Sequence, residues 1–294
     1  MEDGLGHLRD TGGLNAFIRV LANAGLEQDL FDRLRDRLRA RYATLSADLN
    51  DLQSVDTANE ADDVQVLREI ARTGFDNLRG CEWRRAGPWE IQFNLLRAMR
   101  PMRNSQRPVS SIYEPFDGTG FHFNKPFMRD ETIWSGELLG QSVDLFYNKY
   151  PFVDLHGLLV PAREQCLPQY MTRDLHDYIW HLVKFLGATI PHVKIAYNAF
   201  GAYASVNHLH LQLCVRPQRL PVESGRWVHN GGGTRYPVDC QVFVDPRHAW
   251  GLISGCTGKT ARITCSTLPH ACMSCRGESR ASSPCPRGRM ACPG

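Results

Sequence analysis

Long apolar runs and targeting signals are absent from this sequence. No stretch of about 18 consecutive apolar residues occurs in the 294 residues, so no membrane-spanning helix is predicted. The N-terminal residues Met1-Glu2-Asp3-Gly4 lack the basic segment and the apolar core of a secretory signal. With 43% hydrophobic residues, the chain can still bury a sizeable core. We therefore expect a cytoplasmic, globular protein without a membrane partner.

A net positive charge is absent outside the C-terminal segment. The formal net charge is +3, but residues 256–294 carry six Lys or Arg against one acidic residue. That segment has a net charge of +5, which leaves −2 for residues 1–255. A body with net negative charge lacks the basic footprint that binding to a polyanion requires. We expect no nucleic-acid partner.

The common signatures of cofactor and metal binding are also missing from residues 83–255. This region contains neither a Gly-x-Gly-x-x-Gly fingerprint nor a Walker loop, and its cysteines are isolated. Isolated cysteines in a cytoplasmic protein are usually small core residues. We expect no cofactor and no metal site here.

The C-terminal residues 256–294 lack what a folded core needs. They include no aromatic residue and no Val, and Ile263 and Leu268 are their only large aliphatic side chains. Because it is rich in Cys, Arg, Ser and Pro, we expect this tail to be disordered. Two alternatives stay open. Cys272-x-x-Cys275 could bind zinc with other Cys or His residues of the tail, or the tail could result from a shifted reading frame or altered splice.

The N-terminal region, residues 1–82, is predicted to be a helical extension. Apolar residues recur at helical spacing from residue 14 to residue 52, with Gly25 marking a break, and a third helix is expected over residues 62–73. The region contains no recognisable catalytic constellation. We expect it to pack on the core or on a partner.

Residues 83–255 are predicted to form the main domain, of the α+β class. Two apolar runs, 143–147 and 157–160, flank a Pro-containing connection and are typical of paired strands. A helix is expected from Thr172, as the N-cap, to Gly187, followed by a strand over 193–198. This order of elements favours an antiparallel sheet with packed helices over a doubly wound fold.

The most informative motif lies in the last predicted strand of this series. If residues 208–213 alternate as in a strand, His208, His210 and Gln212 share one face, and the leucines between them face the core. A bare His-x-His motif is often only a solvent-facing pair. A metal pair would need further ligands, and the motif contains no acidic residue or cysteine.

This set of side chains is suited to chemistry at phosphorus. A neutral imidazole is a good nucleophile toward phosphorus, and the phosphoramidate that it forms can pass the phosphoryl or nucleotidyl group onward. A second imidazole could hold the nucleophile's tautomer, and the amide of Gln212 could donate to a non-bridging oxygen. The hydroxyl or backbone N–H of Ser205 could also reach the phosphate.

The motif resembles that of the histidine-triad superfamily, His-x-His-x-His or His-x-His-x-Gln preceded by an Asn–Gly–Ser stretch. The matching positions are Asn198, Gly201, Ser205, His208, His210 and Gln212. Upstream, Asn148-Lys149-Tyr150-Pro151 and residues 156–161 look like the strand pair that holds the ribose in this superfamily. Hydrolases typically have His at the third position, whereas galactose-1-phosphate uridylyltransferase and the related phosphorylases have Gln. Gln212 therefore favours transfer over hydrolysis.

A closer resemblance is to the GDP-hexose phosphorylases, the group of GDP-L-galactose and GDP-D-glucose phosphorylases. It runs from about Gln92 to about Ser254. The shared motifs include Gln92-Phe93-Asn94, Pro115-Phe116-Asp117, residues 121–125, Cys166-Leu167-Pro168-Gln169, residues 204–210 and Leu220-Pro221-Val222-Glu223. Several agreements in the same order are far more specific than the histidine motif alone. After Ser254 the tail departs from the family pattern.

The resemblance implies a sugar-nucleotide phosphorylase that cleaves a GDP-hexose with inorganic phosphate. His210 would attack the nucleoside-linked phosphorus, while His208 and Gln212 would orient and stabilise the reacting groups. Ser205 would contact the phosphate, Asn148 and Asn198 would hold the ribose and loop, and His156 would be a pocket histidine or a structural one. Lys125 and Arg163 are the candidate phosphate-binding cations.

Such a chain could assemble as a homodimer. The alternatives are a diadenosine polyphosphate phosphorylase, a nucleotide hydrolase, or an inactive nucleotide-binding protein.

Overall fold

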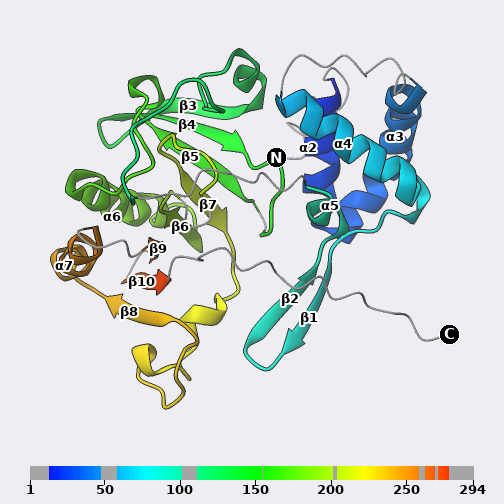
Figure 1. Ribbon diagram of the computed structural model, residues 1–294. Coiled ribbons are helices and arrows are strands. Elements are labelled where there is room, and N and C mark those ends of the chain that lie inside the picture. The colour runs from blue at the N-terminus through cyan, green and yellow to red at the C-terminus, as the bar shows by residue number, and fades with distance from the viewer. Residues whose placement is uncertain are drawn as a thin grey trace.

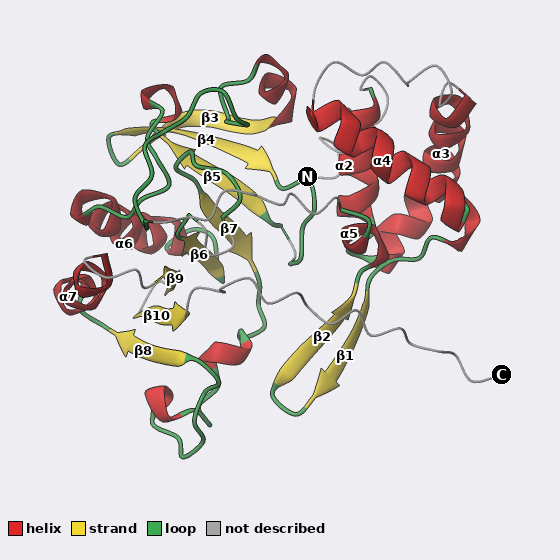
Figure 2. Cartoon of the chain, viewed as in Figure 1, coloured by secondary structure: helices red, strands yellow, loops and turns green. Residues whose placement is uncertain are grey.

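A computed structural model describes residues 13–47, 58–100, 111–153, 155–200, 204–257, 262–268 and 271–277. Helices and strands are both present, and the α+β class expected from the sequence is confirmed. A helical bundle lies on one side of a large sheet, and two further helices lie on the other side in the view of Figure 1. Figure 2 shows the same arrangement coloured by secondary structure.

The bundle consists of α2 (Leu14–Ala24), α3 (Gln28–Ala47) and α4 (Ala58–Thr73), with a short 3-10 turn at Phe75–Asn77. Gly25 follows α2 directly, as the predicted break requires. Buried apolar side chains on all three helices pack into one cluster, which also includes Leu96 and Tyr147 of the following region. The helices therefore share a core with the main domain.

A two-stranded hairpin, β1 (Glu82–Ala86) and β2 (Trp89–Phe93), projects from the body and leads into the short helix α5 (Leu95–Ala98). Trp83, Ile91 and Phe93 on this hairpin are exposed. Asn94 begins α5, because its side chain accepts a hydrogen bond from the backbone N–H of Arg97.

The large sheet has the strand order β3-β4-β5-β7-β6-β9-β10-β8, and every recorded pair in it is antiparallel. Its first five strands in sequence order are β3 (Thr132–Leu138) at one edge, β4 (Gln141–Tyr147), β5 (Gly157–Pro161), β6 (Val193–Asn198) and β7 (Leu211–Val215). The 3-10 turn η3 (Pro126–Glu131) directly precedes β3, and η4 (Arg163–Gln165) follows β5. Two more 3-10 turns lie at Pro221–Glu223 and Val228–Asn230.

Helices α6 (Arg173–Gly187) and α7 (Pro246–Thr257) pack on the sheet beside β6 and β8 (Asp239–Phe243). Thr172 caps α6 as expected, since its hydroxyl accepts from the N–H of Leu175. Apolar residues of α6, α7 and the central strands form the second large core cluster, with Leu182, Val183 and Leu211 fully buried. Within the described residues, no helix is both long and apolar enough to cross a membrane.

The C-terminal tail differs in part from the expectation of disorder. Residues Arg262–Leu268 form β9 and residues Ala271–Gly277 form β10, so the prediction is wrong for these two segments. The physical reason is backbone pairing: β9 pairs with β6, and β10 pairs with both β9 and β8. Residues 278–294 and the side chains of the proposed zinc ligands Cys272 and Cys275 lie outside the described part of the chain.

Candidate active site

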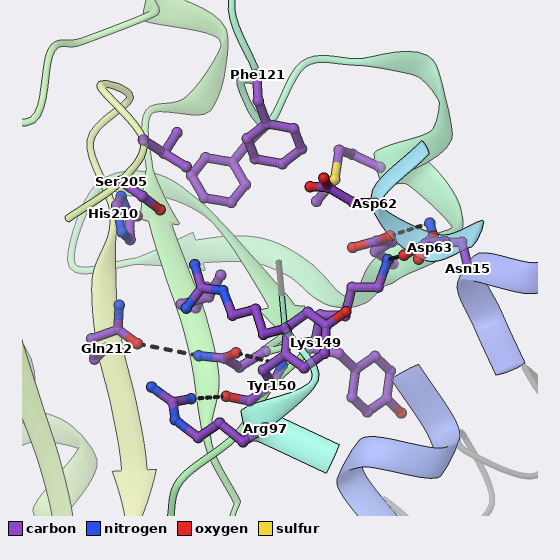
Figure 3. A pocket seen from close by; sticks show the side chains of 18 of the residues that line it. Asn15, Asp62, Asp63, Arg97, Phe121, Lys149, Tyr150, Ser205, His210 and Gln212 are labelled. Carbon is purple, nitrogen blue, oxygen red and sulfur yellow. Dashed lines mark hydrogen bonds and ion pairs between the residues drawn. The ribbon is translucent and has the colours of Figure 1, made fainter. Parts of the chain in front are cut away.

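One cavity gathers polar and aromatic side chains from distant parts of the sequence (Figure 3). The helical bundle contributes Asn15, Asp62 and Asp63; the segments around α5 and η3 contribute Arg97, Arg100, Phe121, Phe123 and Phe127; and the sheet and its loops contribute Asn148, Lys149, Tyr150, Asn198, Ser205, His210 and Gln212. Five residues singled out in the sequence thus lie around one cavity, namely Asn148, Asn198, Ser205, His210 and Gln212.

His210 stands at the wall of this cavity in a single tautomer. The side chain is 5% exposed, and its Nδ1–H donates to the carbonyl oxygen of His208 over 2.8 Å. Nε2 is therefore the nitrogen that keeps a free electron pair. Burial lowers the pKa of His210, which keeps the ring neutral at neutral pH. A neutral imidazole with an available Nε2 is the form that nucleophilic attack requires.

The backbone of His210 is held by Gln169, which the sequence motifs contain but which was not among the predicted site residues. The Oε1 of Gln169 accepts from the N–H of His210 over 2.8 Å, and its Nε2 donates to the carbonyls of His210 and Asn198. The side chain is 1% exposed. Gln169 thereby joins the end of β6 to the segment that precedes β7 and fixes both next to the cavity.

His208 lies apart from the cavity wall, because β7 begins only at Leu211 and the strand alternation expected for residues 208–213 does not extend to His208. Its Nδ1 accepts from the N–H of Phe123 over 3.1 Å, and its Nε2–H donates to the carbonyl of Arg163 over 3.1 Å. Burial lowers the pKa of His208 to about 4. Its backbone carbonyl, rather than its ring, is what contacts the ring of His210.

Gln212 takes part in a network with Asn148 and His156. Its Oε1 is 2.5 Å from Nε2 of His156 and 3.4 Å from Nδ2 of Asn148. His156 is 2% exposed and is not among the residues that line the cavity, although it directly precedes β5. The adjacent Gly157 allows β4 to approach closely, since a Cβ there would lie 2.8 Å from Cδ1 of Leu145.

The two cations expected from the sequence, Lys125 and Arg163, are not among the residues that line the cavity. Nε of Arg163 donates to Asp144 over 2.8 Å and its Nη1 to the carbonyl of Phe123 over 3.3 Å, and Lys125 precedes η3. Among the described residues, the lining includes the cations Arg97, Arg100 and Lys149. No motif marks Arg97 or Arg100, and Lys149 lies within the Asn148–Pro151 motif but was not predicted as a phosphate-binding cation.

These cavity cations have distinct surroundings. Arg97 donates to the carbonyl of Tyr150, and burial, together with the neighbouring Arg100, lowers the pKa of its guanidinium. Lys149 forms an ion pair with Asp63 of α4. Burial lowers the pKa of Lys149, while the Asp63 carboxylate opposes that shift. Lys149 is thus tied to the bundle, and Arg97 and Arg100 supply positive charge to the cavity.

No metal-binding cluster of three or more His, Cys, Asp or Glu side chains occurs in the described part of the chain. Gly201 of the histidine-triad pattern falls within residues 201–203, which are outside the described ranges.

Comparison with protein families gives a match that includes most of this site. Residues 89–214 match the family described as "GDPGP1-like, N-terminal domain". This part of the chain is therefore similar to a GDPGP1-like N-terminal domain. The resemblance to GDP-hexose phosphorylases inferred from the sequence motifs is therefore confirmed.

Curated relatives of the GDPGP1-like domain carry consistent names. The chain is 30% identical over 139 residues to GDP-D-glucose phosphorylase 1 of Danio rerio, an alignment that covers 45% of this chain and 38% of that protein. It is 27% identical over 140 residues to GDP-L-galactose phosphorylase 2 of Arabidopsis thaliana, covering 41% of this chain and 32% of that protein. The chain thus spans well under half the length of these relatives.

Among solved structures, yeast Ap4A phosphorylase Apa2 in complex with Ap4A is similar with a TM-score of 0.43 and 15% sequence identity. The match covers 66% of this chain and 72% of that chain.

The residues that match this family model do not include the whole cavity lining. His210, Gln212, Asn148 and Gln169 lie within residues 89–214, whereas Asn15, Asp62 and Asp63 come from the helical bundle outside this range. These three bundle residues were not predicted, because their sequence neighbourhood shows only helical periodicity and their place at the cavity depends on tertiary packing.

Proposed function

We propose that this chain is a nucleotidyltransferase that cleaves a GDP-hexose with inorganic phosphate. The observation that carries the proposal is the buried, neutral His210, whose Nδ1–H is bonded to the His208 carbonyl and whose Nε2 is left for attack. The names of the curated relatives support the substrate class.

In the first step, the Nε2 electron pair of His210 forms a bond to the phosphorus that carries the guanosine. The bond from that phosphorus to the bridging oxygen breaks, and hexose 1-phosphate leaves with the electron pair. The ring becomes positively charged, and its Nδ1–H, held by the His208 carbonyl, stabilises that charge. The proton stays on Nδ1 throughout.

In the second step, an oxygen of inorganic phosphate attacks the same phosphorus and breaks the N–P bond. The products are GDP and neutral His210, so that the enzyme returns to its starting state. In this proposal the amide of Gln212 and the hydroxyl of Ser205, which line the cavity, donate to the non-bridging oxygens, and Arg97 and Arg100 offset the charge of the diphosphate.

The experiment is turnover of GDP-D-glucose and GDP-L-galactose by the purified chain, with and without phosphate, and with product separation by chromatography. We expect repeated turnover to hexose 1-phosphate and GDP only when phosphate is present, at most one equivalent of hexose 1-phosphate per chain without it, and neither product with His210→Asn. Release of GMP at an undiminished rate without phosphate would instead identify a hydrolase. A folded chain that binds nucleotide but never turns over would contradict the proposal in favour of a silent binding protein.

A further inference from the structure

The connection between β4 and β5, residues 148–156, determines which way the Asn148 amide points. The backbone N–H of Tyr150 donates to Oδ1 of Asn148 over 3.0 Å. Because Oδ1 is thereby identified as the acceptor, the other amide atom, Nδ2, is the one directed at Oε1 of Gln212. The Asn148 carbonyl also accepts from Asn23 of α2 over 2.9 Å, which holds this end of the loop against the bundle.

The same loop determines the tautomer of His156. The backbone N–H of Phe152 points at Nδ1 of His156 over 3.4 Å, so Nδ1 is the accepting nitrogen and Nε2 carries the proton. Nε2–H then donates to Oε1 of Gln212 over 2.5 Å. Nδ2 of Asn148 also lies 3.2 Å from Nε2 and 3.4 Å from Nδ1 of His156, and in this tautomer it donates to Oε1 of Gln212 rather than to Nε2. The ring of Phe152 packs edge-on against the imidazole at 4.5 Å, and burial lowers the pKa of His156 to about 4, so the ring stays neutral.

Two donors therefore meet at one face of the Gln212 amide. Turning this amide over would place its NH2 group against Nε2–H of His156 and the NH2 of Asn148, with no acceptor among the three. With Oε1 toward the loop, Gln212 instead accepts hydrogen bonds from both Nε2–H of His156 and the NH2 of Asn148. Figure 3 shows the result: the amide oxygen of Gln212 faces the dashed hydrogen bond, and its nitrogen lies on the side of His210.

We propose that His156 and Asn148 are positioning residues that act through Gln212. They fix its amide so that the NH2 group donates to a non-bridging oxygen of the phosphorus bound to His210. This inference rests on the proposed function for the identity of the phosphorus. It gives His156 a role without substrate contact, in agreement with its absence from the residues that line the cavity.

The test is a double-mutant cycle of His156→Leu and Gln212→Ala. Two quantities are measured for each variant: the single-turnover rate of guanylyl-His210 formation from GDP-D-glucose, and the Kd for GMP. Removal of one preorganised donor at a developing oxyanion typically slows a reaction by about 10²-fold to 10³-fold. We expect a loss of this order for Gln212→Ala and a large part of it for His156→Leu. The double variant should be no worse than Gln212→Ala alone, since His156 has nothing left to position.

Two further variants separate positioning from a general loss of structure. His156→Gln keeps a side-chain donor and should recover part of the rate that His156→Leu loses. The matched control is His176→Leu on α6, a buried histidine that bonds Asp177 and does not touch the cavity, and it should leave both quantities unchanged.

Independent losses that multiply in the double variant would overturn the inference, because His156 would then act without Gln212. No recovery in His156→Gln, together with a loss in His176→Leu, would likewise point to a merely structural effect. If the wild-type chain forms no guanylyl-histidine, the proposed function fails, and coupling in the Kd for GMP alone decides whether His156 positions Gln212.

Discussion

At the scale of single residues, the candidate site depends on histidines that are kept neutral and in one tautomer. His210, His208 and His156 are each almost fully buried, and burial lowers the pKa of each ring. Each ring has at least one nitrogen bonded to a backbone group, which selects the tautomer. In the proposed function, the same residue type thus serves as nucleophile (His210), as packed support (His208) and as the residue that positions the Gln212 amide (His156), because the neighbours of each ring differ.

The lowered pKa of His156 predicts how the free energy of unfolding depends on pH. The unfolded state binds a proton near pH 6.5, whereas the folded state resists protonation until about pH 4. The contribution of His156 is therefore fully present above pH 6.5 and is lost as the pH falls from there toward 4. The expected slope is about 1.4 kcal/mol per pH unit for one such group.

The measurement is the free energy of unfolding in urea for the wild type and His156→Leu from pH 4 to pH 8. Other groups titrate equally in both proteins, so the difference between them isolates His156. This difference should be constant above pH 6.5 and should shift in favour of the variant as the pH falls toward 4. A difference that does not change with pH would contradict the assigned burial and hydrogen bonding.

At the scale of elements, sequence patterns predicted the regular pieces better than the segments between them. The apolar spacing around Gly25 and the cap at Thr172 depend on local chemistry, and α2, α3 and α6 begin or end there. The His-x-His segment differs, since it precedes β7 and is held by Gln169 and by the carbonyl of Leu167. The hydrogen bond between Gln169 and the N–H of His210 joins residues 41 positions apart, and no local sequence pattern predicts it.

The cavity cations show the same limit. Lys125 and Arg163 lie near the motifs in sequence, but the Arg163 side chain contacts Asp144, Glu164 and Phe123. Arg97 reaches the cavity because α5 packs beside the β4–β5 connection, where it donates to Tyr150. Such a placement depends on tertiary packing, which residue type and spacing alone do not encode. Backbone pairing likewise explains β9 and β10, which the composition of the tail argued against.

At the scale of the whole molecule, the helical bundle is joined to the sheet domain by buried charges. Arg19 of α2, which is 1% exposed, pairs with Glu131 at the end of η3, and Asp63 of α4 pairs with Lys149. Asn15 also donates to Glu131 over 2.7 Å. Because Asn15, Asp62 and Asp63 line the cavity, these contacts connect the placement of the bundle to the site.

Arg19→Met tests this connection. Removing one partner of a buried ion pair leaves the other charge uncompensated, and the typical cost is about 3 to 5 kcal/mol. We expect a loss of this order in the free energy of unfolding, measured in urea by tryptophan fluorescence, together with a marked drop in turnover of GDP-D-glucose.

The matched control is Arg72→Met on α4, whose pair with Glu69 is solvent-exposed. Its expected effect is about 0 to 1 kcal/mol, with turnover unchanged. Equal stabilities for Arg19→Met and Arg72→Met, or full turnover in Arg19→Met despite lost stability, would show that the site does not depend on the bundle.

The central claim is that Nε2 of His210 carries the nucleotide during transfer, and a single measurement addresses it directly. The chain is mixed with GDP-D-glucose in the absence of phosphate, digested, and examined by mass spectrometry for a guanylyl group. We predict that the modification is on the peptide containing His210, that added phosphate removes it as GDP, and that His210→Asn never acquires it. A guanylyl group on any other residue, or undiminished labelling of His210→Asn, would contradict the claim.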